Sequence, residues 1–357
     1  MKYILIFLCV FILAGCGAAG VKEPEVLTIA LWNVQNLFDG EETGTEYADF
    51  RQGAGWGPEK YQARLTSLSQ AITTKPAAPD LIGFIEVENS GVLADLSRSL
   101  SKNGYNWTAF TKLPGSAAGI GFLSSFPLLE VKAHSITIGQ ETAPRPVLEL
   151  RLDVRGETLV FLLNHWKSKL GGADATESIR RASARVVYRR LSEIKEAEGD
   201  TPVIIMGDFN LNHDDFYRRS LSGNLVLCAL LPDDPEASLL VVNAQGSAIS
   251  QPDFLVLSTQ KPPLPVYFPE EIHALYSPWG EEKEGGSYFY REEWETIDGF
   301  LLSKGAFSGA GWEFSGSQVL NHEPFITSGG RPNAYIPRSG RGLSDHLPLL
   351  LFLNYLE

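Results

Sequence analysis

Cysteine is scarce in this sequence. Only three of the 357 residues are cysteines, and two of them, Cys9 and Cys16, lie in the apolar N-terminal stretch. Cys228 therefore stands alone in the remainder of the chain, which excludes a disulfide within it. Without the cross-links that stabilise many small exported domains, the fold has to rely on its hydrophobic core. The sequence also shows no internal repeat and no long low-complexity segment.

Positive charge is in short supply as well. Lys and Arg number 30 against 43 Asp and Glu, which gives a formal net charge of -13. Domains that bind nucleic acid over a broad surface usually carry a basic face, so a contact with such a polymer must be small and local, or the substrate is not a long polyanion. Acids gathered around a divalent cation would add to the negative count. The composition, 44% hydrophobic and 20% charged, is that of a globular protein, and the length fits one large domain or two average ones.

The N-terminus has the pattern of an export signal. Lys2 gives a positive start, residues 4–13 are apolar, and Ala14-Gly15-Cys16 follows. The apolar run is too short to span a bilayer. The small residues before Cys16 resemble the lipobox of bacterial lipoproteins; the alternative is an ordinary signal peptide cut near residues 18–19. We expect a signal peptide at 1–15, a lipidated linker at 16–25 and a folded domain at 26–357, anchored through Cys16 to a membrane of the bacterial cell envelope.

Apolar runs of strand length alternate with two helical patterns. One helix is expected to begin near Pro58, and a second to run from about Asp174 to Glu198, with Asp174 and Glu177 at capping-box spacing and Gly199 at its end. Strands are expected at 27–32, 81–85, 119–123, 147–154, 159–163, 203–206, 297–302 and 347–353, and loops at 39–57, 264–296 and 332–342. Several strands are apolar throughout, which is typical of strands covered on both faces. We therefore expect an α/β domain of two packed sheets with helices outside.

The second helix is rich in arginine. Apolar residues can form its buried stripe, and the arginines lie mostly on other faces. We interpret them as a solvated surface, with a phosphate-attracting patch as the alternative. They are Arg180, Arg181, Arg185, Arg189 and Arg190.

Polar residues recur at the ends of the apolar strands, where a scaffold can expose a reactive group. Asn33 follows the first strand, and its amide can bind a phosphate oxygen or a metal-bound water without adding charge; alone it also suits a turn. Glu86 closes the second strand, where a carboxylate is costly unless it is paired or coordinated. Carboxylate oxygens suit Mg²⁺, Mn²⁺ or Ca²⁺. The alternative for Glu86 is a surface acid or a helix cap.

Two further strands end in groups suited to phosphoryl chemistry. His165 follows residues 159–163 and can donate a proton, and Lys167 can screen substrate charge; a structural histidine is the alternative. Asp208 and Asn210 follow residues 203–206. Side chains two apart on an extended segment face the same side, so this pair can hold one water, with an Asp-based turn as the alternative.

Acids and a histidine also flank the last two strands. Asp298 enters the strand at 297–302, and Asp345 and His346 precede the strand at 347–353. Adjacent residues on an extended segment point in opposite directions. They therefore need different partners: a metal for Asp345, and an acid such as Asp298 to orient His346.

Taken in this order, the strand-end residues resemble the endonuclease/exonuclease/phosphatase superfamily over residues 26–355. The resemblance implies a four-layer α/β/β/α sandwich of two packed, mixed and mainly antiparallel sheets, and a divalent cation, Mg²⁺ or else Mn²⁺ or Ca²⁺. It implies metal binding by Glu86 with Asn33 beside it, and by Asp345 unless that residue tunes His346. It implies catalytic roles for five residues: Asp208 activates water, Asn210 orients it, His346 held by Asp298 contacts the phosphate, and His165 stabilises developing charge.

Details resemble the extracellular nuclease branch of this superfamily. Residues 164–169 are similar to its Asn-His-x-Lys-Ser-Lys stretch, and Arg145 before Pro146 to its phosphate-contacting arginine. Substrate contacts by Arg145, Lys167 and Asn164 are therefore implied. Departures from the pattern are Ile85 in place of Gln, Gly299 after the acid at 298, and the lack of an acid that the sequence can place beside the histidine at 165.

Three functions follow, and we favour the first. It is metal-dependent hydrolysis of phosphodiester bonds in nucleic acid. The second is hydrolysis of phospholipid or inositol phosphate, which the membrane anchor and loop aromatics at 279, 288–290 and 294 would serve. The third is a surface lipoprotein that binds a partner without catalysis.

Overall fold

The computed structural model describes residues 24–74, 78–138, 141–143, 145–213, 255–259, 261–262, 273–281 and 285–357, the first two residues of 141–143 and the short strands at 11–14 and 227–230 by their backbone alone. Most of the expected signal peptide, Cys16 and nearly all of the expected linker lie outside these residues, so the lipoprotein stays a prediction. Within the described ranges, no helix is both long and apolar enough to cross a membrane.

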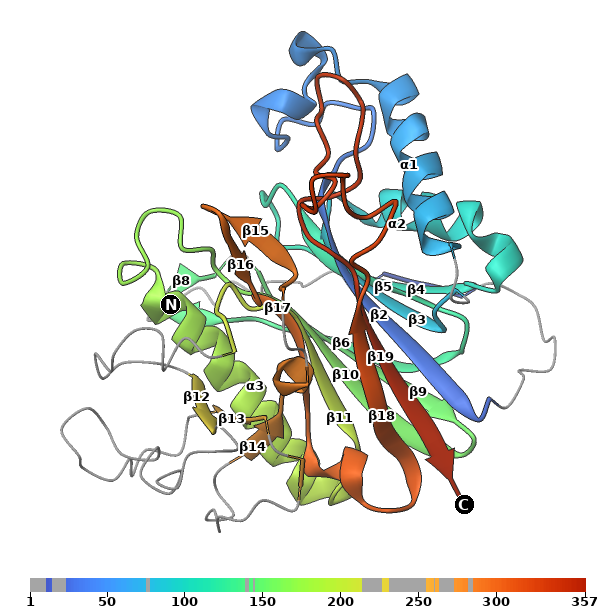
Figure 1. Cartoon of the computed structure of the whole chain (residues 1–357), viewed down its shortest axis with the longest axis vertical. Helices are drawn as coiled ribbons and strands as arrows, with labels where there is room; N and C mark the ends of the chain where they lie inside the picture. The colour runs from blue at the N-terminus through green and yellow to red at the C-terminus, as the bar shows by residue number, and fades with distance from the viewer. Residues whose placement is uncertain are drawn as a thin grey trace, which may run out of the picture.

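Two mixed sheets pack face to face among the described residues, with helices on their outer faces (Figure 1). The first sheet has the strand order β1 (Phe11–Ala14), β4 (Trp107–Thr111), β5 (Gly119–Ser124), β3 (Leu81–Val87), β2 (Val26–Leu37), β19 (Leu349–Leu356), β18 (Gly311–Val319). The second has the order β12 (Leu227–Leu230), β13 (Leu255–Ser258), β14 (His273–Tyr276), β17 (Asp298–Leu302), β11 (Val203–Asp208), β10 (Glu157–His165), β9 (Val147–Val154), β6 (Leu128–His134).

Three α-helices and several short elements complete the described fold. α1 (Pro58–Ile72) and α2 (Ser90–Ser99) cover the first sheet, and α3 (Glu177–Glu198) covers the second (Figure 1). Two small hairpins are formed by β7 (Thr137–Ile138) with β8 (Glu141–Thr142) and by β15 (Tyr288–Tyr290) with β16 (Glu293–Glu295). Single 3₁₀ turns lie at Ala48–Phe50, Gln52–Ala54, Ser101–Asn103, Pro278–Gly280 and Lys304–Phe307. This α/β/β/α sandwich confirms the predicted fold class.

Strands buried on both faces build the middle layers. In β10, Leu159, Phe161 and Leu163 belong to the core between the sheets, whereas Val160 and Leu162 belong to the core under α3. Successive strand residues point to opposite faces of the sheet. A strand that is covered on both faces therefore has a continuous run of apolar residues in the sequence. This is why all eight predicted strands are present, each starting within two residues of its expected first residue.

Elements with weaker patterns were not predicted. The sequence patterns do not predict α2, β4, β6 and β18. β14 and the hairpin β15–β16 occupy described parts of the predicted loop at 264–296. β18 lies at a sheet edge with one face partly exposed, and Ser315, Gly316 and Ser317 interrupt its apolar run. Edge strands of this kind have no continuous apolar signature.

The start of α3 differs from the prediction in two ways. The helix begins at Glu177, and its N-cap Thr176 makes no side-chain capping hydrogen bond, so the expected capping box is absent. Arg180 is 0% exposed rather than solvated. Its guanidinium donates to the carbonyl oxygens of Lys167 and Ala173 and pairs with Glu177. Arg180 therefore ties the helix to the loop that carries Lys167.

Candidate active site

Predicted site residues from both sheets meet at one end of the sandwich. β2 and β3 are parallel neighbours, as are β10 and β11, so the carboxyl ends of each pair lie together. His165 is in register with Asp208, and Asp208 with Asp298. Ser344, ahead of β19, donates through Oγ to the carbonyl oxygen of Asn33 at 2.7 Å. Segments far apart in the chain therefore contribute to one cleft.

Glu86 stands on unusual backbone at the end of β3. Its φ of +67° lies in the left-handed region that residues other than glycine seldom adopt. The strand register shifts between Ile85 and Val87 at this point. The carboxylate, 20% exposed, accepts a hydrogen bond from Asn33 Nδ2 at 3.4 Å and from the backbone nitrogen of Asn36 at 2.9 Å. The bulge thus aims Glu86 at the cleft.

Asn33 links the two sheets through its amide group. Its Nδ2 donates to Asp208 Oδ2 at 3.2 Å as well as to Glu86, and its Oδ1 accepts from the backbone nitrogen of Gln35 at 3.0 Å. That backbone donor fixes the orientation of the amide, so Asn33 presents a donor to the cleft. In the structure Asn33 holds the Glu86 and Asp208 carboxylates, and metal ligation by Asn33 stays a prediction.

A buried arginine holds the turn that ends β2. Gln35 and Asn36 have left-handed φ values of 51° and 58°. Arg64 of α1, 1% exposed, donates to the carbonyl oxygens of Val34, Gln35 and Asn36 at 2.5, 2.6 and 2.9 Å, and its guanidinium lies 3.7 Å from the centre of the Tyr335 ring. Burial lowers the pKa of Arg64 to about 10. These contacts set the backbone from which Asn33 projects.

Gln35 fastens the same turn to the segment before β19. Its side chain donates to the carbonyl oxygen of Tyr335 at 3.2 Å and accepts from the backbone nitrogens of Tyr335 and Asp345 at 2.7 and 3.0 Å. Neither Gln35 nor Arg64 is among the predicted site residues. A signal for Arg64 existed, because it lies three residues after Tyr61 and so falls on the buried stripe of α1.

The turn after β11 differs from the extended segment assumed in the sequence analysis. Asp208 is 3% exposed and accepts a hydrogen bond from the Asn210 backbone nitrogen at 2.9 Å. Asn210 has a φ of +52°, and its Nδ2 donates to the Trp166 carbonyl oxygen at 3.1 Å. A Cβ on Gly207 would lie 2.3 Å from the Asn164 carbonyl oxygen, so β11 approaches β10 too closely for any other residue.

Asn164 does not reach the cleft. Its side chain is 0% exposed; Nδ2 donates to the Leu162 carbonyl oxygen at 2.8 Å, and Oδ1 accepts from Trp166 Nε1 at 3.0 Å. Both polar atoms of the Asn164 amide are therefore used inside the fold, and its contact with substrate stays a prediction. Its role is to position the loop that follows β10.

His165 lies between the two carboxylates. Its Nε2 is 3.7 Å from Asp208 Oδ2 and 3.8 Å from Glu86 Oε1. Burial, together with the positive charges of Arg145 and His346, lowers the pKa of His165 well below its ordinary value, so the ring is neutral at physiological pH.

Arg145 and Lys167, predicted to contact substrate, lie on the same side of the cleft. Arg145 Nη1 donates to the Trp166 carbonyl oxygen at 2.6 Å, and Lys167 donates to Ser168 Oγ at 3.4 Å. Burial and then the charge of Arg145 lower the pKa of Lys167. Both side chains are half-buried, so they bring local positive charge into an otherwise acidic site.

His346 and Asp298 form the pair expected from the sequence. His346 Nδ1 and Asp298 Oδ2 are 2.7 Å apart, and both residues are buried. Burial opposes the charged imidazolium, but the charge and hydrogen bond of Asp298 outweigh it and raise the pKa of His346 well above its ordinary value. Ser287 Oγ, which is not among the predicted site residues, donates to the same Asp298 oxygen at 2.6 Å. Asp345 lies at the rim, 36% exposed and 3.9 Å from His346 Nε2.

The acidic donors fit a divalent cation. Burial raises the pKa of Glu86, and burial followed by repulsion from Asp298 raises that of Asp208. Donor atoms of Asp208, Asp298 and His346 lie within 4.8 Å of one another, and Asp298 Oδ1 has no hydrogen-bond partner among the described residues. Buried carboxylates gathered in this way are stabilised by a hard cation. Glu86 and Asp208 would supply the oxygen ligands, since His346 Nδ1 is engaged by Asp298.

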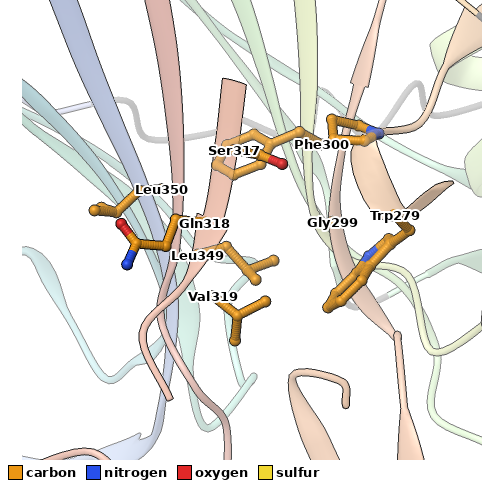
Figure 2. A pocket seen from close by; sticks show the side chains of 9 residues that line it. Trp279, Gly299, Phe300, Ser317, Gln318, Val319, Leu349 and Leu350 are labelled. Atoms are coloured by element: carbon orange, nitrogen blue, oxygen red, sulfur yellow. The ribbon is translucent and has the colours of Figure 1, made fainter. Parts of the chain in front are cut away.

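A hollow beneath the cleft is not part of the site. It lies between β17 and the β18–β19 pair and is lined by mainly apolar residues, among them Trp279, Phe300, Val319 and Leu349 (Figure 2). None of its lining residues is titratable. Trp279 Nε1 donates to the Asp298 carbonyl oxygen at 2.9 Å, so this layer supports the base of the His346–Asp298 pair.

The class that fold and site define is an α/β/β/α sandwich with a cleft of buried acids and histidines, an arrangement suited to phosphate esters. The model of the Endonuclease/Exonuclease/phosphatase family matches residues 28–241, and the chain belongs to this family. Members of the family are typically metal-dependent phosphoesterases. No curated protein matches the chain.

Solved structures agree with this assignment at the level of the fold. A TDP2 of D. rerio humanized by 14 mutations is 15% identical, with 93% of this chain and 100% of that chain covered and a TM-score of 0.52. An endonuclease/exonuclease/phosphatase family protein from Bacteroides thetaiotaomicron is 15% identical, with coverage of 93% and 95% and a TM-score of 0.52. A mannosyl-6-phosphatase from the same organism is 16% identical, with coverage of 92% and 100% and a TM-score of 0.51.

Proposed function

We propose that this protein hydrolyses phosphodiester bonds in nucleic acid with the help of a divalent cation, Mg²⁺ first and Mn²⁺ or Ca²⁺ as substitutes. The observation that carries the proposal is the meeting of Glu86, Asp208, His165 and the His346–Asp298 pair in one cleft. A cation bound there neutralises phosphate charge and lowers the pKa of water. Phosphoryl transfer needs little beyond such positioning and charge stabilisation.

The side chains have distinct tasks in this reaction. Asp208 accepts the proton of the attacking water, and Asn210 fixes the turn that holds Asp208. His346, charged and oriented by Asp298, donates a hydrogen bond to a phosphoryl oxygen. Arg145 and Lys167 attract the phosphate locally, which suits a protein whose net charge is -13. Tight binding of a long duplex would need many more such contacts, so single-stranded and short substrates are favoured.

Activity on lipid is less well supported by the geometry. Of the aromatic residues suggested for membrane contact, Trp279 is buried, Tyr288, Phe289 and Trp294 are partly buried, and only Tyr290 is exposed. Such an arrangement leaves one ring, rather than an aromatic surface, to enter a bilayer.

A metal and substrate panel tests the proposal. The purified chain is incubated with Mg²⁺, Mn²⁺ or Ca²⁺ and with single-stranded DNA, plasmid DNA, RNA, sphingomyelin or inositol phosphates. Nucleic acid should be cut, and Asp208→Asn should lower kcat by about 10²–10⁴-fold. The matched control is Asp200→Asn, because Asp200 is 53% exposed and lies beyond the opposite end of β11. Turnover of lipid without cleavage of nucleic acid, or silence on every substrate, would refute it.

We also propose that Cys16 carries lipid and anchors the enzyme to the bacterial cell envelope. The support is the sequence alone, since Cys16 lies outside the described residues. In cells, the wild-type chain should sediment with membranes, and Cys16→Ser should not incorporate labelled fatty acid. Equal membrane association and labelling of both forms would contradict the anchor.

A further inference from the structure

A row of aromatic rings leads outward from the histidine of the cleft. The Tyr288 ring lies over His346, with centroids 4.6 Å apart and planes inclined by 31°. The Tyr290 ring is next, 6.3 Å from Tyr288 and inclined by only 17°. Residues two apart on a strand share a face, which explains why these β15 residues stack in line. The row is therefore a continuation of the catalytic cleft.

The outer end of this row is open and already holds a planar cation. Tyr290 is 47% exposed, and the Arg291 guanidinium lies 5.1 Å from the centre of its ring. Arg291 is itself exposed. A ring that accepts a guanidinium can accept another flat group, and the displaced cation can then move to a neighbouring phosphate.

The hairpin that carries the row is tied to the cleft. Tyr288 forms a β-bridge with His346, and the backbone nitrogen of Leu347 donates to the Ser287 carbonyl oxygen at 2.7 Å. Phe289, on the opposite face, packs against Trp294 at 5.2 Å between centroids. These contacts hold the rings in a fixed position relative to His346.

We propose that Tyr288, Tyr290 and Arg291 form a stacking subsite for a nucleobase of the single strand being cut, within about one to three nucleotides of the scissile phosphate. This inference rests on the proposed function. Two ring contacts, with centroids 4.6 and 6.3 Å apart, separate Tyr290 from His346, so the subsite lies close to the scissile phosphate. The subsite contributes affinity that does not depend on charge, which a chain of net charge -13 requires. Stacking on aromatic rings also tolerates every base.

Oligonucleotides with a single cleavable bond test this subsite. In a 12-mer, all linkages except one are phosphorothioates, and each base near the remaining phosphodiester is replaced in turn by an abasic tetrahydrofuran. Stacking is worth about 1–3 kcal/mol per base, so Tyr290→Ala should lower kcat/KM on the intact oligonucleotide by about 5–150-fold. The loss should fall mainly on KM. Tyr290→Phe keeps the ring and should stay within about twofold of wild type.

The abasic series identifies the base that stacks. At one position, removing the base should lower kcat/KM of the wild-type enzyme by the same factor as Tyr290→Ala does on the intact oligonucleotide. On that abasic oligonucleotide, kcat/KM of Tyr290→Ala and wild type should agree within about twofold. Phe289→Leu is the matched control for the hairpin, because it alters the opposite face. Raising the salt concentration should lower kcat/KM less for Arg291→Ala than for wild type, since that variant lacks a phosphate contact.

The outcomes separate this inference from the proposed function. If the oligonucleotides are cut but Tyr290→Ala equals wild type, the subsite is refuted and the nuclease stands. The same holds if Tyr290→Phe or Phe289→Leu loses as much as Tyr290→Ala, or if the penalty persists on every abasic oligonucleotide. If the wild-type enzyme cuts no oligonucleotide, both proposals fail.

Discussion

Replacing Arg64 by methionine tests whether the turn at the end of β2 positions the residues of the cleft. Arg64 touches no predicted catalytic group, yet its guanidinium donates to three consecutive carbonyl oxygens at the end of β2. Methionine keeps an unbranched apolar stem of similar reach and removes all three donors. We expect the variant to fold, to be less stable and to lose activity.

The magnitude follows from the buried groups that lose their partner. Each hydrogen bond to a charged group contributes about 1.5–3 kcal/mol, and a carbonyl left buried without a donor costs about 1–3 kcal/mol. Removing the guanidinium also removes its own cost of burial, which the lowered pKa of Arg64 reveals. The net loss in the free energy of unfolding should be about 3 kcal/mol. Because Asn33 projects from the released turn, kcat should fall by about 10–100-fold, as a misplacement of about 1 Å can cause.

Urea denaturation and steady-state kinetics at a temperature where both proteins are folded measure the two effects. Arg98→Met is the control, because Arg98 of α2 is 72% exposed; its stability should change by no more than about 0.5 kcal/mol. An Arg64→Met protein with unchanged stability would refute the assigned contacts. A destabilised protein with unchanged kcat would refute the claim that this turn positions the cleft.

Two further predictions concern stability elsewhere in the fold. Glu149 is 1% exposed and contacts His134, Arg151 and Arg190. Burial opposes its charge, but His134 and Arg190 outweigh burial and lower the pKa of Glu149 from 4.5 to about 2. A carboxyl group whose pKa is lower in the folded than in the unfolded protein stabilises the fold at pH values above its unfolded pKa. Glu149→Gln should therefore lower the free energy of unfolding by about 3 kcal/mol at pH 7 and about 2 kcal/mol at pH 3.5. A difference in stability that urea titrations find to be independent of pH would contradict this. Gly207→Ala should destabilise the protein by more than about 2 kcal/mol and abolish its activity, because the added Cβ would meet the Asn164 carbonyl oxygen. Gly53→Ala is the control, since Gly53 has open space around it. It should have little effect in the same denaturation and activity assays.

The middle of the fold could be predicted because its strands are buried on both faces. Residues 147–154 form a strand with the expected bounds, and the strand-end positions of Glu86, Asp208 and His346 lie together in the cleft. Periodicity and strand-end chemistry suffice for such positions, since they depend on local pattern.

The sequence could not predict contacts between segments that are far apart in the chain. The orientation of the Asn33 amide is set by the Gln35 backbone, the burial of Arg180 by the loop after β10, and the turn at Asn210 by the Trp166 carbonyl oxygen. Each involves a backbone group whose position no spacing rule predicts. The same limit applies to Asn164, whose amide contacts the Leu162 carbonyl oxygen and the Trp166 indole nitrogen inside the fold.

The position of β19 in the first sheet has a consequence for incomplete chains. β19 lies between β2 and β18, so it joins the edge strand β18 to the rest of the sheet. The segment just before β19 carries His346 and the Ser344 hydroxyl, which donates to the Asn33 carbonyl oxygen. A chain that stops before residue 344 lacks this strand and His346 together. On the proposed function, we expect such a chain to be inactive until residues 344–356 have been synthesised and folded.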